Sequence, residues 1–183
     1  ENAARAAPEG TALELSAFGS APNVVDGSGI GAVQCPKRTY EVIRAAKKAV
    51  KVPVIGKLLP EPSNFLDLLQ AVEQAGADAI ASRDTIFPAM AFDIYTRRPK
   101  VARTVGNWMP ELSGRSIREN AVGYVVEIRR RTNLPIIGIG GVHTWEDAVE
   151  MIIAGATGIG VCTAAMVDGP GVFPKLTRGL GDY

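Results

Sequence analysis

Two glycine-containing segments in the last third of the chain have the composition of a phosphate-binding site. Gly140 and Gly141 end one short apolar run, and Gly160 precedes Cys162 and Thr163 at the end of the next. Glycine lets an anion approach backbone N–H groups because no Cβ is in the way, and a threonine hydroxyl can add a donor. The glycines could instead allow tight packing of strand against helix. Their place at the ends of successive strands favours a phosphate site.

Two further side chains near these runs carry a charge or a titratable ring. Lys57 lies near the end of the apolar run 52–58, where it could place a cation in a binding site or lie on the surface with its aliphatic part buried. The Leu-Leu-Pro that follows it favours the binding role. His143 is the only histidine of the chain. It could donate to a phosphate or to the first turn of a helix, although a single histidine in a polar loop is more often structural.

Five short, nearly continuous apolar runs are predicted to be β-strands. Runs without the two-residue alternation of a half-exposed strand indicate strands covered on both faces, as in a parallel sheet. Amphipathic segments between them are predicted to be helices, and Thr144 and Asp147 have the spacing of a capping box. The predicted strands are 12–18, 52–58, 79–84, 135–141 and 158–164, and the predicted helices are 39–50, 65–75, 116–131 and one that follows Thr144 and ends before Gly155.

Alternating strands and helices predict right-handed β/α units on a parallel sheet, and hence an α/β protein of the (β/α)8 TIM-barrel class. A closed barrel needs about 250 residues, whereas this chain has 183. We therefore expect residues 1–183 to form a single barrel domain that contains the last five β/α units, with the N-terminal strands missing. A five-stranded open sheet is the alternative.

Two long segments are predicted to lie at the functional face. The segment 86–113 is much longer than the roughly two to six residues that usually join a strand to a helix. It follows a predicted strand on the face where barrel enzymes bind ligands, so it is a candidate lid or substrate wall. An insertion without function is the alternative. The segment 23–33, rich in Gly and Asp, follows the first strand and could form a second flap.

The composition of the chain argues against several classes of binding partner and cofactor. A formal net charge of +1 gives no basis for binding nucleic acid or an anionic membrane. No apolar run reaches the roughly 18 residues of a membrane span, and the first residues do not have the build of a signal peptide, so a cytoplasmic protein is expected. Cys35 and Cys162 are too few for a disulfide framework or for an iron–sulfur cluster held by this chain alone, and no metal site is predicted.

From about residue 11 to residue 179 the chain resembles the FMN-dependent dihydroorotate dehydrogenases, and more closely the flavin domain of dihydropyrimidine dehydrogenase. The segment 13–16 (LELS) is similar to the family's Asn-x-Ser strand end, and 56–60 (GKLLP) to its Lys-Leu-x-Pro strand. The resemblance implies a barrel that binds FMN, with a lysine beside the flavin ring. The residues it implies for FMN binding are Lys57, Asp84 and Thr85 at the family's Asn-Thr pair, Ser113 and Gly114 of its Ser-Gly loop, Gly140, Gly141, Cys162 and Thr163.

The position of the family's catalytic base departs from the pattern. The family has a Cys or Ser base at or next to the residue that follows Asn-x-Ser, and here that residue is Ala17. A methyl group cannot accept a proton. Ser16, Ser20 or Cys35 could substitute for the base, and the sequence does not select one. Cys35 could equally be a small packed hydrophobic residue.

Two carboxylates replace family asparagines that hydrogen-bond a pyrimidine ring. They are Glu14 and Asp84. An ionised carboxylate only accepts hydrogen bonds and repels an anion, which argues against dihydroorotate as the substrate. A substrate that offers donors or positive charge is favoured, unless one carboxylate is protonated. Both residues are also candidate proton shuttles.

The implied activity is hydride transfer between flavin N5 and a small cyclic, dihydropyrimidine-like substrate, at a CH–CH bond. Electrons are expected to reach the flavin through another domain or subunit, because the chain has neither a cluster motif nor a complete dinucleotide fingerprint. A homo-oligomer or a hetero-complex is expected. One alternative is a non-flavin barrel that binds a sugar phosphate or heterocycle phosphate in the same pocket. The other is a non-catalytic barrel subunit of a larger redox complex, consistent with the loss of the base at position 17.

Overall fold

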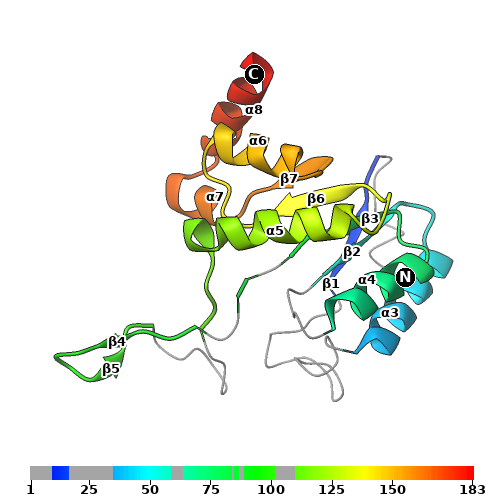
Figure 1. The fold of residues 1–183 in the computed structure, drawn as a ribbon, viewed down its shortest axis with the longest axis horizontal. Helices are drawn as coiled ribbons and strands as arrows, with labels where there is room; N and C mark the ends of the chain where they lie inside the picture. Colours follow the sequence, from blue (N-terminus) through cyan, green and yellow to red (C-terminus); the bar gives the residue numbers. More distant parts are fainter. Residues whose placement is uncertain (1–9, 17–34, 59–63, 84, 87–88, 102–109) are drawn as a thin grey trace.

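The computed structural model describes residues 10–16, 35–58, 64–83, 85–86, 89–101 and 110–183, and a five-stranded sheet runs through them (Figure 1). The strands lie in the order β1-β2-β3-β6-β7, and each neighbouring pair is parallel. This order in space follows the order in the sequence, as in a β/α barrel. The sequence predicts each of the five strands, which are β1 (Leu13–Ser16), β2 (Val54–Lys57), β3 (Ala79–Ala81), β6 (Ile136–Ile139) and β7 (Gly158–Gly160).

Helices join the successive strands of this sheet. They are α3 (Pro36–Ala49), α4 (Phe65–Gln74), α5 (Arg118–Arg129) after the 3-10 turn η1 (Gly114–Ile117), and α6 (Trp145–Ile153). The prediction of each helix is confirmed. Helix α3 begins at Pro36 rather than at Thr39, because proline fits a first helical turn, where its missing N–H leaves no gap in the bonding. Thr144 and Asp147 form the predicted capping box of α6.

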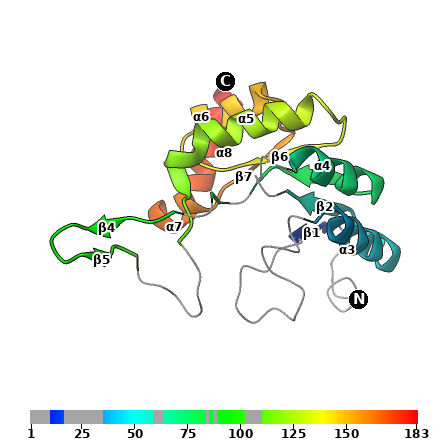
Figure 2. The ribbon, with the colours of Figure 1, turned by 60° about the horizontal axis from the view of Figure 1, so that its bottom comes forward.

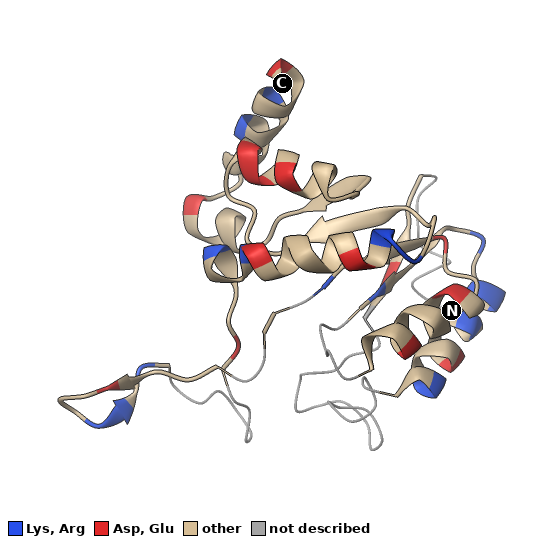
Figure 3. Ribbon diagram, viewed as in Figure 1, with Lys and Arg blue, Asp and Glu red and all other residues tan. Residues whose placement is uncertain are grey.

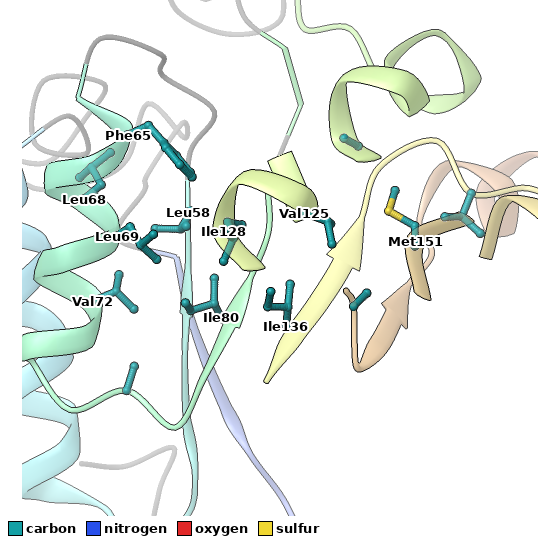
Figure 4. Packing of buried hydrophobic residues seen from close by; sticks show 14 of the residues in the cluster. Leu58, Phe65, Leu68, Leu69, Val72, Ile80, Val125, Ile128, Ile136 and Met151 are labelled. Carbon is teal, nitrogen blue, oxygen red and sulfur yellow. The ribbon is translucent and has the colours of Figure 1, made fainter. Parts of the chain in front are cut away.

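The buried core lies between the helices and one face of the sheet. Val54, Ile80 and Ile136 are fully buried on that face and pack with apolar side chains of the helices (Figure 4). Ile55 and Ile137 alternate with them along their strands, are only partly buried, and stand outside this cluster. Alternate side chains of a strand point to opposite faces. One face of the sheet is therefore packed against helices, and the other carries the residues that face a barrel interior.

The C-terminal part of the chain differs from the prediction. The sequence predicts a strand over 158–164, but β7 ends at Gly160, and Thr163 begins the short helix α7 (Thr163–Asp168). Helix α8 (Val172–Asp182) is not predicted, because glycines within it lower its helix propensity. Gly179 serves a close approach instead, since a Cβ at this position would collide with the ring of Trp145 on α6. Contact between the two helices thus overrides local propensity.

The long segment 86–113 has its own structure where it is described. Its ends are joined by a bridge between Ile86 and Leu112. The strands β4 (Phe92–Asp93) and β5 (Arg98–Pro99) form an antiparallel hairpin that projects away from the sheet (Figures 1 and 2). The side chain of Asp93 accepts hydrogen bonds from two amides of the turn. The lid role of this segment stays a prediction, and the predicted flap 23–33 lies outside the described residues.

The sign of the charged side chains differs from helix to helix among the described elements. The charged residues of α3 are mostly Lys and Arg, those of α4 and α6 are all Asp or Glu, and α5 carries both signs (Figure 3). Among the described residues, no helix combines the length and the apolar character that crossing a bilayer requires.

Candidate functional site

A cavity of about 280 Å³ lies at the end of the sheet where β2, β6 and β7 finish. Parallel strands meet with their carboxyl ends at one edge, so the residues that follow several strands converge there. Every residue predicted from the sequence to bind FMN that the structure describes lines this cavity, and Asp84 lies outside the described residues. The residues concerned are Lys57, Thr85, Ser113, Gly114, Gly140, Gly141, Cys162 and Thr163.

The two glycines after β6 have backbone conformations that side chains rarely adopt. The φ of Gly140 is +120° and that of Gly141 is +79°. A Cβ on Gly140 would lie 2.8 Å from Cβ of Ala121, and a Cβ on Gly141 would lie 2.6 Å from Cβ of Arg118 and 2.7 Å from its Cα. Tight packing against α5 therefore accounts for both glycines. Such packing is the alternative that the sequence leaves open, and it coexists with their place in the cavity wall.

The same loop carries backbone donors beside the cavity. Within the part of the chain that the structure describes, no group accepts a hydrogen bond from the amides of Gly141 or Val142. Both residues line the cavity. An amide that faces a cavity can donate to an anion, and two adjacent amides suit a phosphate oxygen.

Hydroxyl groups complete this end of the cavity. Oγ1 of Thr163 donates to Oγ of Ser113 over 3.2 Å, which connects the start of α7 with the start of η1. Gly114, between Ser113 and the rest of η1, has a φ of +73°, and a Cβ there would lie 3.1 Å from Cγ2 of Thr163. The glycine thus lets the two hydroxyl-bearing segments approach each other.

A buried carboxylate holds the loop after β6 in place. Oδ2 of Asp147 accepts hydrogen bonds from the amides of His143, at 2.9 Å, and Thr144, at 2.8 Å. Oδ1 of Asp147 pairs with Nη1 of Arg118 at 2.9 Å. The sequence indicates the helix cap, but not the second amide or the arginine. Arg118 is 29 residues away in sequence, and no local pattern marks that contact.

The electrostatic environment of Asp147 favours its ionised form. Burial of the side chain raises its pKa, but the hydrogen bonds from the two amides and the charge of Arg118 outweigh that effect, so its pKa lies below the ordinary value of 3.8. Arg118 also contacts the more exposed Glu119 and Glu150. The loop that carries Gly140 and Gly141 is therefore tied to both α5 and α6.

At the β1–β2 end, Lys57 lines the cavity and pairs with Glu14, which is not among the lining residues. Lys57 ends β2 and is in register with Ser16 of β1. Its Nζ lies 3.6 Å from Oε1 of Glu14, and the two side chains are 18% and 39% exposed. Glu14 is in register with Ile55, which lies on the face of the sheet away from the packed helices, so the Glu14–Lys57 pair faces the barrel interior. This pair has no signal in the sequence, because it joins residues of separate strands.

The candidates for a catalytic base stay predictions. Ser16 ends β1 next to the strand that carries Lys57. Cys35 is half-buried at the start of α3 and is not among the residues that line the cavity. Ala17, Ser20 and Asp84 lie outside the described residues.

Known proteins resemble this chain in sequence and in fold. A family profile described as dihydroorotate dehydrogenase matches residues 11–183. "Dihydroorotate dehydrogenase B (NAD(+)), catalytic subunit" of Methanothermobacter thermautotrophicus is 39% identical over 161 residues, which are 88% of this chain and 52% of the relative. The protein of the same name from Pyrococcus horikoshii is 36% identical over 176 residues, covering 96% and 55%. The chain thus spans about half the length of the curated relatives it matches.

The solved structures agree with this result at the level of the fold. The DHODH of Eimeria tenella in complex with ferulenol superposes with a TM-score of 0.68 and 20% identity, covering 92% of this chain and 48% of that one. At this identity the likeness supports a barrel fold alone. The match of the family profile over nearly all of the sequence goes further: the chain belongs to the dihydroorotate dehydrogenase family.

Proposed function

We propose that this chain is the FMN-binding part of an oxidoreductase that transfers a hydride between flavin and a small cyclic, dihydropyrimidine-like substrate. Members of its family are FMN-dependent enzymes. The observation that carries the proposal is the convergence of the described FMN-binding candidates, from five separate segments, on one cavity. A barrel fold alone would not require this, since barrels serve many chemistries.

The donors of the cavity suit the two ends of FMN. At the β6–β7 end, the amides of Gly141 and Val142 and the hydroxyls of Ser113 and Thr163 would bind the phosphate group. At the other end, Lys57 would place its charge beside the flavin ring and favour electron-rich states of that ring. When it is bound, FMN supplies the hydride acceptor or donor of the reaction. The described residues that line the cavity include no Asp or Glu, which would oppose an anionic ligand.

The ion pair at the β1–β2 end limits the class of substrate that the site would bind. Glu14 lies beside Lys57 and only accepts hydrogen bonds when it is ionised. A ring that offers N–H donors suits this carboxylate, whereas a second carboxylate on the substrate would be repelled. We therefore expect a neutral dihydropyrimidine-like ring rather than dihydroorotate, the substrate in the name of the relatives. Glu14, Ser16, Cys35 and Asp84 remain the candidates for moving the proton.

The proposed electron partner is a separate subunit or domain. The relatives are named as catalytic subunits that act with NAD(+). The sequence of this chain has no complete dinucleotide fingerprint. We propose that electrons pass between its flavin and a partner that binds the nucleotide, within a hetero-complex.

The visible absorption spectrum of the purified full chain, with mass identification of any small molecule released on denaturation, tests this proposal. We expect a flavin spectrum and release of FMN, and we expect Lys57→Met to retain FMN but lose reduction by substrate. A colourless protein that stays empty after incubation with FMN would favour the barrel that binds another phosphate. Bound FMN that no dihydropyrimidine reduces would favour the non-catalytic subunit, which Ala17 makes the second candidate.

A further inference from the structure

The imidazole of His143 has a defined orientation. Its Nδ1 lies 3.1 Å from the carbonyl oxygen of Gly141. A carbonyl oxygen can only accept a hydrogen bond, so Nδ1 carries the proton. In the neutral ring Nε2 is then an acceptor, and it becomes a donor only when the ring takes up a second proton. Within the described part of the chain, Nε2 has no hydrogen-bond partner.

The ring stands beside the hydroxyl end of the cavity. His143 lines the cavity. A Cβ on Gly114 would lie 3.8 Å from Cε1 of His143 and 3.1 Å from Cγ2 of Thr163, so the ring and the threonine converge on the same glycine. Cε1 is bonded to both ring nitrogens, and Nδ1 is engaged by the loop. The nitrogen that remains for a ligand is Nε2.

The backbone that carries the ring is held in place. The amides of His143 and Thr144 donate to Asp147, which is 5% exposed and is itself paired with Arg118. The ring is therefore fixed at both its backbone and its Nδ1. A side chain fixed in this way loses little conformational freedom when it binds a ligand.

The charges around the ring decide what it can bind. Lys57 and Cys162 are the other titratable described residues in the cavity wall. Asp147 is paired with Arg118, which also pairs with the more exposed Glu119 and Glu150, and none of these four residues lines the cavity. No described carboxylate lines the cavity to accept a hydrogen bond from a protonated ring. An anionic ligand would supply that acceptor.

We propose that His143 binds the phosphate group of the ligand through Nε2 and takes up one proton from solvent as the phosphate binds. This inference rests on the phosphate site of the proposed function and adds a proton-linked ligand to it. The neutral imidazole and the phosphate dianion become an imidazolium–phosphate pair, with one proton gained by the complex. Ligand binding is therefore tighter at pH 6 than at pH 8.

Proton NMR of the full chain provides the first test, because His143 is the only histidine and its Cε1–H resonance needs no further assignment. We expect FMN, and inorganic phosphate at higher concentration, to move the titration midpoint of this resonance to higher pH by about one unit. Riboflavin, which has no phosphate, should leave the midpoint in place. An unchanged midpoint in the presence of bound FMN would overturn the inference.

Affinity measurements with His143→Gln provide the second test. Glutamine can donate a hydrogen bond at every pH and retains the backbone amide that Asp147 binds. We expect the FMN affinity of the wild-type chain to fall about tenfold more between pH 6 and pH 8 than that of the variant. This comparison removes the ligand's own titration. Thr163→Val should lose affinity by the same factor at both values of pH.

The outcomes separate this inference from the proposed function. A chain that does not bind FMN, but whose His143 midpoint moves with inorganic phosphate, would refute the flavin proposal and support the histidine. A chain that binds FMN with identical pH dependence in the wild type and His143→Gln would do the reverse. A chain in which neither ligand binds would refute both.

Discussion

The two ends of the cavity differ in their chemical groups. At the β6–β7 end the wall consists of glycines, amides and hydroxyl groups, and the loop behind it is tied to two helices through Asp147 and Arg118. At the β1–β2 end the wall presents a lysine paired at 3.6 Å with Glu14, and both side chains are partly exposed. Packed backbone determines the shape of the β6–β7 end. Side chains that can be substituted without moving the backbone determine that of the β1–β2 end.

The two ends differ in what a substitution would change: the position of the backbone at one end, and the chemistry of a side chain at the other. The geometry of an anion site depends on where the backbone lies, so a substitution there acts on the fold as well as on the ligand. An exposed ion pair contributes little to stability, so residues at the other end can change the chemistry of the site at small cost to the fold. Glu14, which stands in place of the family's asparagine, lies at the end where such a change is tolerated.

The largest effect is expected from Gly141→Ala. The new Cβ would lie within 3 Å of the backbone of Arg118, and the φ of +79° disfavours any side chain. Strain and overpacking together should lower the free energy of unfolding by about 3 kcal/mol and abolish FMN binding. Urea denaturation and cofactor titration measure the two effects.

The matched control for this variant is Gly123→Ala. Gly123 lies within α5, is exposed, and has no atom near the position of a new Cβ. Alanine should there raise the free energy of unfolding by roughly 0.5–1 kcal/mol, because glycine is the poorer helix former. Equal stability of the two variants would mean that the loop after β6 is not held as the structure shows.

An intermediate effect is expected from Asp147→Asn. The oxygen of the new amide can still accept from both loop amides, but its NH2 group then faces Arg118, so the variant loses the ion pair and brings two donors together in a buried place. We expect a loss of about 2 kcal/mol at neutral pH, and weaker FMN binding without a change in flavin reduction potential. Glu150→Gln, which removes one of the two exposed partners of Arg118, should cost well under about 1 kcal/mol.

The pH dependence of stability sharpens this prediction. The pKa of Asp147 is lower in the folded chain than its ordinary value of 3.8, so its carboxylate contributes stability above that value. The contribution is lost as the pH falls through the folded pKa, where the carboxyl group is protonated. The difference in unfolding free energy between wild type and Asp147→Asn should therefore be constant from pH 5 to 7 and shrink below pH 3.8. A difference that grows on acidification would contradict the assignment.

The two ends also differ in how well the sequence predicts them. The five strands follow from their continuous apolar runs, and the glycines at the ends of β6 and β7 point by residue type and position to the cavity wall in which the structure places them. The tie between Arg118 and Asp147 does not follow, because the two residues belong to different helices. Sequence patterns report local geometry and burial, whereas this contact depends on how two β/α units pack.

The errors of prediction have the same origin. Residues 160–164 have the composition of a strand, but the ladder with β6 ends at Gly160, after which the chain turns into α7. In α8, Gly179 lowers helix propensity, yet it is the residue that permits contact with Trp145. In both places the outcome depends on a partner segment that local propensity does not include.

The smallest effect on stability, and the most informative effect on chemistry, is expected from Glu14→Gln. Because the pair with Lys57 is long and partly exposed, its loss should change the free energy of unfolding by about 0.5 kcal/mol or less. The carboxylate, however, offsets the charge that Lys57 offers to the flavin. Its removal should raise the reduction potential of bound FMN, and Lys57→Met should lower it, because a nearby positive charge favours the added electrons.

Potentiometric titration of the three FMN-loaded proteins should give the order Glu14→Gln, wild type, Lys57→Met from highest to lowest. If instead Glu14→Gln leaves the potential unchanged while Lys57→Met lowers it, the glutamate acts on the substrate rather than through the lysine, and the β1–β2 end divides into two independent sites.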